Sequence, residues 1–173
     1  CERQTMQMAS VTGERRGDVR GTERHGGQKG KRREVNNRHN QEAKNRDVGK
    51  MRDAGGRGLA FCVDCGEEQQ VEAMFAMIDA LGEPLAALVN NAGILFTQCT
   101  VENLTAERIN RVLTTNVTGY FLCSREAVKR MSHAHGGKGG AIVNVSSAAS
   151  RLGAPREYVD YAASKGAVDT LTT

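Results

Sequence analysis

The chain has 173 residues, 39% of them hydrophobic, which is a size typical of one globular domain with a substantial core. No apolar run approaches a membrane span and the N-terminus lacks the apolar stretch of a signal peptide, so we expect a cytoplasmic protein without a membrane partner. The formal net charge of +4 comes from residues 1–58, which hold 15 Lys/Arg against 8 Asp/Glu. This basic segment lacks interleaved aromatic residues and any recognisable nucleic-acid reading module, so no nucleic-acid partner is expected.

The first third of the chain is the least regular part. Between Glu14 and Glu34 it is rich in Arg, Gly and Lys and almost without apolar residues, and Gly costs about 1 kcal/mol at each interior helix position. We therefore expect residues 1–57 to be a degenerate, poorly ordered part of a single domain, and residues 58–173 to be its well-patterned part. Because the chain begins with Cys1 rather than Met, we expect it to be a piece of a longer reading frame.

Strand and helix patterns alternate from Gly58 onward. Short apolar runs predict buried strands, and apolar residues at helical spacing predict helices between them. The predicted strands are 59–63, 85–89 and 141–145, and the predicted helices are 71–81, a long one after 105 and another from about 158. This alternation predicts an α/β fold, a Rossmann-like doubly wound parallel sheet with helices on both faces.

The apolar residues of the two longest helical patterns define the faces that we expect to be buried. In the first helix they are Val71, Met74, Phe75, Ile78 and Leu81, ahead of the helix-ending Gly82 and Pro84. In the long helical stretch they are Ile109, Val112, Leu113, Val117, Tyr120, Phe121 and Val128.

The five cysteines predict neither disulfides nor a metal site. An odd number of cysteines without a secretory signal fits reduced thiols. Cys62 and Cys65 form a CxxC pair, but no second pair and no nearby His complete a tetrahedral zinc site.

Polar residues follow each of the three predicted strands. Asp64 follows the first, Asn90-Asn91-Ala92-Gly93 ends the second, and Ser146-Ser147 follows the third. Ligands of open parallel sheets bind outside the carboxyl ends of the strands, so these residues mark a predicted binding site.

Tyr161 and Lys165 lie four residues apart, on one face of the last predicted helix. A free phenol, with a pKa near 10, is a poor acid at neutral pH. A positive charge about 5 Å away is worth roughly 3 kcal/mol at an effective dielectric of about 20, enough to make such a phenol a usable general acid. Exposed Tyr/Lys pairs are common on helices, so this interpretation depends on the polar strand ends as well.

Four motifs together resemble the short-chain dehydrogenase/reductase family, in its order and at close to its spacing. They are NNAG at 90–93, TNVTGYF around Asn116, IVNVSS at 142–147 and YAASK at 161–165. The resemblance covers about Gly55 to Thr173 and is strongest to bacterial oxidoreductases grouped with glucose dehydrogenases and 3-oxoacyl-carrier-protein reductases. It implies an NAD(P)-dependent oxidoreductase that moves a hydride between a nicotinamide cofactor and a small-molecule carbonyl or alcohol.

The resemblance implies a role for each catalytic residue. Tyr161 would give the proton to the carbonyl oxygen, and Lys165 would hold the nicotinamide ribose hydroxyls. Ser147, with Ser146 as the alternative, would hydrogen-bond the substrate oxygen. Asn116 would hold the water of a proton relay.

The same resemblance implies the cofactor contacts, which include Tyr161 and Lys165. Asp64 would bond the adenine edge, and Asn91 and Gly93 would line the adenosine ribose. Glycines are needed in the dinucleotide loop because its backbone approaches the pyrophosphate closely.

The dinucleotide loop and the cofactor preference fall in the basic segment. Gly13 and Gly17 match two glycines of the family's TGxxxGxG pattern, but Val19 replaces the last one. The end of the family's second strand carries no acid here, and Arg16 and Arg38 stand where a 2′-phosphate would be met. NADP(H) is therefore favoured, with NAD(H) as the alternative.

Two interpretations of the whole chain remain open at the level of sequence. The family's fold continues beyond the last predicted helix with two more strands and a helix, so the domain is expected to be incomplete. In the first interpretation, the chain is part of a working oxidoreductase. The resemblance implies that the full-length form of such an enzyme is a homotetramer or homodimer. The second is a non-catalytic remnant that binds no cofactor.

Overall fold

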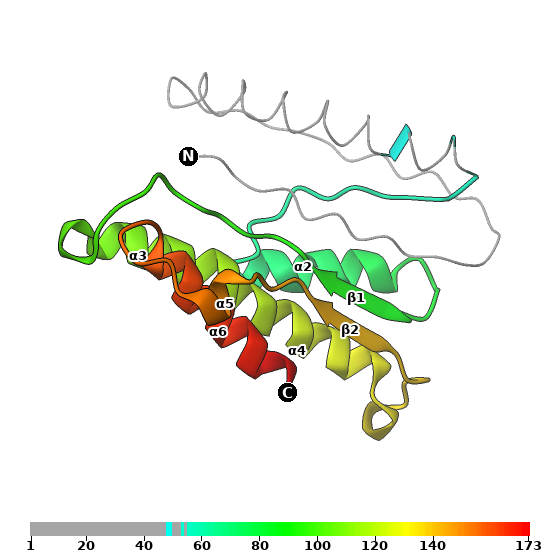
Figure 1. The fold of residues 1–173 in the computed structure, drawn as a ribbon. Helices are drawn as coiled ribbons and strands as arrows, with labels where there is room; N and C mark the ends of the chain where they lie inside the picture. Colours follow the sequence, from blue (N-terminus) through cyan, green and yellow to red (C-terminus); the bar gives the residue numbers. More distant parts are fainter. Residues whose placement is uncertain (1–47, 50–52, 54) are drawn as a thin grey trace, which may run out of the picture.

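The computed structural model describes residues 48–49, 53 and 55–173, and Figure 1 shows their arrangement. Short 3₁₀ turns lie at Val101–Asn103 and His133–His135, and a π-helical turn lies at Thr114–Thr118. The helices and strands, in chain order, are α2 (Glu68–Asp79), β1 (Ala87–Asn90), α3 (Ala106–Leu113), α4 (Gly119–Met131), β2 (Ala141–Asn144), α5 (Ala149–Leu152) and α6 (Val159–Thr172).

The two strands confirm the predicted parallel pairing. β1 and β2 lie side by side in parallel, in a register that pairs Ala87 with Ala141 and Asn90 with Asn144. The chain between them runs through α3, the π-turn and α4, which form one long continuous helix in Figure 1. This is the βαβ unit that alternating strand and helix patterns predict.

Within the described part of the chain, the predicted strand at 59–63 has no strand partner. Residues 56–64 are neither helix nor strand, and Figure 1 shows them as a stretched segment above α2. Val63 is buried, whereas Leu59 is 52% exposed. The apolar run predicts correctly that this segment contributes to the core. A strand also needs a hydrogen-bonded neighbouring strand, which apolar side chains alone do not supply.

The sheet is covered on one face by the helices that the structure describes. Leu88 and Asn90 are buried on that face, whereas Val89 and Val143 on the other face are about half exposed. The prediction of a fully buried strand at 85–89 was therefore wrong for the described structure. Alternate burial follows from the two-residue period of a strand when helices pack on one side.

The core joins α2 to α4 beneath β1. In α2 the four residues Val71, Met74, Phe75 and Ile78 are buried as predicted. Leu81 is 47% exposed, because the helix ends at Asp79 and the chain turns at Gly82 with a φ of +70°. A left-handed residue of this kind suits Gly and commonly ends a helix.

The buried face of the long helix differs from the predicted one. Leu113, Phe121 and Val128 are exposed by 39%, 52% and 46%. The π-turn adds a residue to one turn and so rotates α4 relative to α3. The buried positions then follow one another at three- and four-residue steps through the turn: Val112, Asn116, Tyr120, Cys123, Ala127 and Met131.

An ion-pair network at the buried carboxylate of Glu126 also joins α4 to α2. Burial raises the pKa of Glu126, but hydrogen bonds from Lys129, Arg130 and Arg125 outweigh burial and lower it to about 2. Arg130 donates in addition to both carboxylate oxygens of Asp79 on α2. The charged partners of Glu126 thus connect the two helices above the apolar core.

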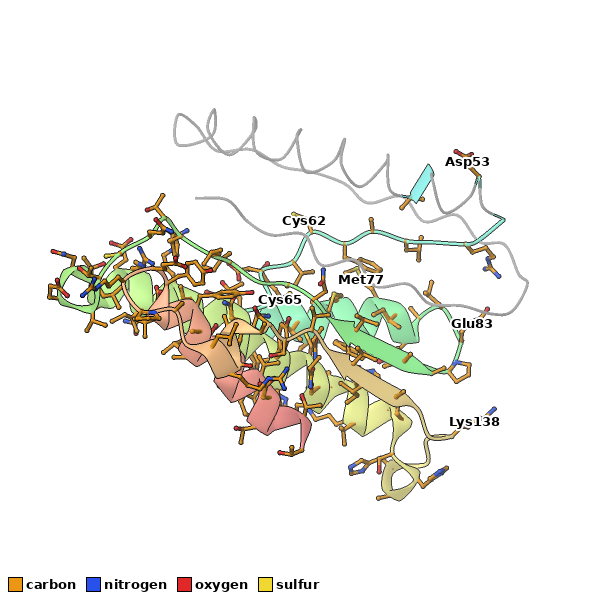
Figure 2. All side chains as sticks on the ribbon, viewed as in Figure 1. Asp53, Cys62, Cys65, Met77, Glu83 and Lys138 are labelled. Carbon is orange, nitrogen blue, oxygen red and sulfur yellow. The ribbon has the colours of Figure 1, made fainter. Side chains whose placement is uncertain are left out.

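The packing of α2 leads to a prediction about stability. Phe75 is fully buried and its ring lies 4.9 Å from the Arg130 guanidinium. Phe75→Ala should lower the free energy of unfolding by about 3–5 kcal/mol because it leaves a cavity. Met77→Ala on the exposed side of α2 (Figure 2) is the control, and should change it by less than about 0.5 kcal/mol. Urea unfolding of both variants would check this, and equal losses would contradict the assignment of the core face.

Candidate active site

The parallel pairing of β1 and β2 places their carboxyl ends at one edge of the sheet. Residues 91–93 leave from β1 there, and Ser146 and Ser147 follow β2. The backbone confirms this arrangement, because Val145 donates its N–H to Asn90 O at 2.9 Å. Helix α6, which carries Tyr161 and Lys165, packs against β2 and the π-turn.

Asn116 is the buried centre of the site. Its Oδ1 accepts from Ile94 N at 2.7 Å, and its Nδ2 donates to Ile94 O at 3.0 Å. Nδ2 also donates to Ser164 Oγ at 3.0 Å. The side chain, which has no exposed surface, therefore joins the segment after β1 to α6. Its place in the π-turn accords with the frequent occurrence of such turns at functional sites.

Ser164 is a site residue that the sequence reasoning missed. It is fully buried, accepts from Asn116, and donates to Tyr161 O at 2.7 Å. Its position in YAASK, three residues after Tyr161, was the available signal, since residues three apart share a helix face. Ser164 links Asn116 to the turn that carries Tyr161.

Lys165 is a buried cation that is solvated by neutral groups. Lys165 is only 3% exposed. Its Nζ donates to Val145 O at 2.6 Å and lies 3.5 Å from Tyr120 Oη. It also lies 5.7 Å from the ring centroid of Tyr161. Burial lowers the pKa of Lys165, and the charge of Asp169 opposes that shift in part. Among the described residues no carboxylate lies within ion-pair distance of this ammonium.

Tyr120 has a part in the site that its apolar pattern did not reveal. Its hydroxyl donates to Val145 O at 3.3 Å, and burial raises the pKa of Tyr120 to about 12. The phenol therefore stays neutral near pH 7, and its single proton faces Val145. Its lone pairs are left for the ammonium of Lys165, which also lies 5.3 Å from the centroid of the Tyr120 ring.

Gly93 lies beside both Asn116 and Lys165. A Cβ atom at Gly93 would stand 3.5 Å from Asn116 Oδ1 and 3.7 Å from Lys165 Nζ. The structure therefore brings together three of the predicted residues, with the ring of Tyr161 next to Lys165.

The two serines after β2 differ in their hydrogen bonds. Ser146 Oγ donates to Lys165 O at 3.3 Å and so points to α6. Ser147 Oγ accepts from Ala149 N at 3.2 Å, an arrangement that leaves its proton for another acceptor. A cavity of about 510 Å³ opens beside them, lined by both serines together with Ala148, Ser150, Arg151 and Asp169.

The predicted adenine contact, Asp64, stands at the start of α2. Its Oδ1 accepts from Gly66 N at 3.1 Å, and its own N–H donates to Gln70 Oε1 at 3.0 Å. A Cβ atom at Gly119 would stand 3.2 Å from Cys65 O, so glycine lets this turn approach α4 closely. Asn91, at the end of β1, is exposed.

The remaining predicted cofactor residues lie outside the described residues. These are Gly13, Arg16, Gly17 and Arg38.

The CxxC cysteines lie in different surroundings. Cys62 is exposed on the extended segment, whereas Cys65 is buried at the turn into α2 (Figure 2). A hydrogen bond with Cys123 lowers the pKa of the Cys65 thiol, against the effect of burial. In the described part of the chain, no group of three His, Cys, Asp or Glu residues is placed to hold a metal ion.

Residues 7–173 match the family described as short chain dehydrogenase. The chain belongs to this family. It is 64% identical over 168 residues to the uncharacterized oxidoreductase YgfF of Escherichia coli (strain K12), covering 97% of this chain and 68% of that protein. It is 42% identical over 125 residues to a 3β-hydroxysteroid dehydrogenase of Mediterraneibacter gnavus, covering 72% of this chain and 44% of that one.

A solved structure, at more than 30% sequence identity, is similar to that of this chain. ElxO with NADP bound aligns with a TM-score of 0.57 and 32% identity, over 64% of this chain and 43% of that one. The predicted family and fold class are thereby confirmed, and the chain spans less than half the length of two of these three relatives. These findings do not favour the non-catalytic remnant. No helix in the described ranges is long and apolar enough to cross a membrane.

The burial of Lys165 leads to a prediction about the stability of the folded protein and its dependence on pH. Lys165→Met should raise the free energy of unfolding at pH 7 by about 0.5–2 kcal/mol, because a buried cation without a carboxylate is removed. Val145 O keeps the Tyr120 hydroxyl as its partner. The folded protein loses the Lys165 proton at lower pH than the unfolded chain. The stability that Lys165→Met adds should therefore decrease as the pH rises towards 10.5, the ordinary pKa of lysine.

Urea unfolding of the full-length protein between pH 7 and 10 would measure this gain. Lys138→Met, at an exposed position (Figure 2), is the control, with an expected change below about 0.5 kcal/mol. A loss of stability in Lys165→Met would show that the ammonium stabilises the fold.

Proposed function

We propose that the full-length protein is an NADP(H)-dependent oxidoreductase that interconverts a small-molecule carbonyl and its alcohol. The observation that carries this proposal is the position of the buried Lys165 ammonium, between Gly93, Asn116 and the ring of Tyr161 at the carboxyl edge of the sheet. This is the edge at which parallel sheets bind their ligands. Membership of the short chain dehydrogenase family supports the same reaction class.

The residues at this edge fit a nicotinamide dinucleotide. Ribose hydroxyls are neutral donors and acceptors, and Lys165 already has a neutral oxygen, Val145 O, as its hydrogen-bond acceptor. A lysine with three donors can keep this bond and offer another to a hydroxyl. The cofactor, when bound, would supply or accept the hydride.

Tyr161 is the proton donor in the proposed reduction. Its phenol would give a proton to the substrate oxygen as negative charge develops there, and would take it back in alcohol oxidation. The Lys165 ammonium lies 5.7 Å from the centroid of the Tyr161 ring. Ser147, whose hydroxyl oxygen accepts from Ala149 N, would donate its proton to the same substrate oxygen. Ser146 remains the alternative, although its proton is directed to Lys165 O.

Asn116 has a positioning role in this proposal. Its side chain makes three hydrogen bonds to Ile94 and Ser164, so a relay water would be held by its backbone carbonyl. The side chain fixes the segment after β1 at a set distance from α6. Loss of this amide would therefore disturb the placement of Tyr161 and Lys165 together.

The preference for NADP(H) rests on Arg16 and Arg38, and on a relative that has NADP bound. Arg–phosphate bonds are charge-assisted and often bidentate, so two arginines would favour a 2′-phosphate. A homodimer or homotetramer in the cytoplasm also remains part of the proposal.

Tyr161→Phe tests the catalytic role. In the full-length protein it should lower kcat by about 100-fold or more, because a general acid contributes about 10²–10⁴-fold. The affinity for NADPH should change by less than about twofold, because the hydroxyl acts mainly in the transition state. The assay is NADPH oxidation with aldehydes, cyclic ketones and 3-oxosteroids, alongside NADPH fluorescence for binding. Lys165→Ala should damage both quantities.

Tyr158→Phe is the matched control, because its ring contacts the Tyr161 ring edge-on at 5.9 Å. It should keep turnover within about threefold of the unchanged protein, since its hydroxyl has no part in the proposed proton transfer. Full activity in Tyr161→Phe would refute the assignment of the acid.

The cofactor preference has its own test. Changing both Arg16 and Arg38 to Gln should raise KM for NADPH by about tenfold or more and leave kcat almost unchanged. The measurement is kcat/KM for NADPH and for NADH in both proteins. Equal values for the two cofactors in the unchanged protein would exclude the preference.

A further inference from the structure

Arg108 on α3 joins two segments that flank the candidate active site. Its Nε and Nη2 donate to the two carboxylate oxygens of Asp160 at 2.8 and 3.2 Å. Its Nη1 donates to Thr97 O at 2.8 Å, and its guanidinium lies 5.6 Å from the centroid of the Phe96 ring. One side chain thus uses three N–H donors on two segments that are more than 60 residues apart in the sequence.

Both segments belong to the site described above. Asp160 directly precedes Tyr161 in the first turn of α6. Residues 94–100 leave from the carboxyl end of β1, directly after Gly93. The backbone of this segment also meets the start of α6, because Cys99 N donates to Glu157 O at 2.6 Å. Arg108 adds side-chain hydrogen bonds to this backbone contact, to Thr97 O on one segment and to Asp160 on the other.

The base of Arg108 is itself fixed. Thr105 caps α3 and its Oγ1 accepts from Arg108 N at 3.2 Å. The side chain of Arg108 is 14% exposed and that of Asp160 is 3% exposed. A bidentate, largely buried Arg–carboxylate pair has a set geometry, unlike most exposed ion pairs. Breaking it would leave a buried carboxylate beside Tyr161 without its partner.

We propose that Arg108 is a positioning residue, which holds residues 94–100 against the first turn of α6 and thereby sets where the substrate oxygen meets Tyr161. The proposal rests on the proposed function. It requires an arginine, because only the planar guanidinium can serve both carboxylate oxygens and Thr97 O at once. Lysine at this position would keep the charge but could not reproduce the three bonds.

Hydrogen exchange tests the clamp without any substrate. In the full-length protein, Arg108→Lys should speed exchange at the Cys99 amide and in the first turn of α6 by about tenfold or more, the effect of losing charge-assisted hydrogen bonds. Exchange in α2 should not change. Arg125→Lys is the matched control, because Arg125 also pairs with several carboxylates, Glu68 and Glu72 on α2 among them. Unchanged exchange at Cys99 in Arg108→Lys would overturn the proposal.

Kinetics then separate positioning from general stability. With a carbonyl compound that the unchanged protein reduces, Arg108→Lys should lower kcat by about tenfold and keep the affinity for NADPH within about twofold. Arg125→Lys should keep both quantities. An unchanged kcat, or equal losses in kcat and NADPH affinity, would overturn the positioning role. The proposed function fails separately, through full activity in Tyr161→Phe, and the exchange measurement does not depend on it.

Discussion

The site depends on the burial of one positive charge among neutral groups. Lys165 is almost fully buried and is held by Val145 O, by the neutral hydroxyl of Tyr120 and by the faces of two tyrosine rings. A carboxylate partner would neutralise the charge and occupy its hydrogen bonds. Without one among the described residues, the ammonium keeps its charge at the carboxyl edge of the sheet, beside the ring of Tyr161.

The π-turn provides the geometry around this charge. It turns α4 so that Tyr120 faces Lys165, and it buries Asn116 between Ile94 and Ser164. Stability comes from elsewhere in the molecule, because the apolar core and the Glu126 network join α2 to α4. The buried cation of the site and the main apolar packing of the described residues therefore lie in different parts of the molecule.

The sequence determined much of this protein by itself. Periodicity gave α2 and its four buried residues, and short apolar runs gave the parallel pair β1 and β2. The NNAG, TNVTGYF, IVNVSS and YAASK motifs led to the family, which the comparisons confirm. These features are predictable because they depend on local spacing and on residue types that the chemistry requires.

Only the tertiary structure decided the rest. Phe121 and Val128 are exposed because α4 packs through the face that carries Tyr120, Cys123 and Ala127, and the apolar pattern of the long helix does not show which face packs. The register of β1 on β2, which pairs Asn90 with Asn144, joins residues 54 positions apart. Tyr120 beside Lys165, and Arg108 between Thr97 and Asp160, join residues that are far apart in sequence. Such contacts depend on how helices pack in three dimensions, and local spacing carries no record of that packing.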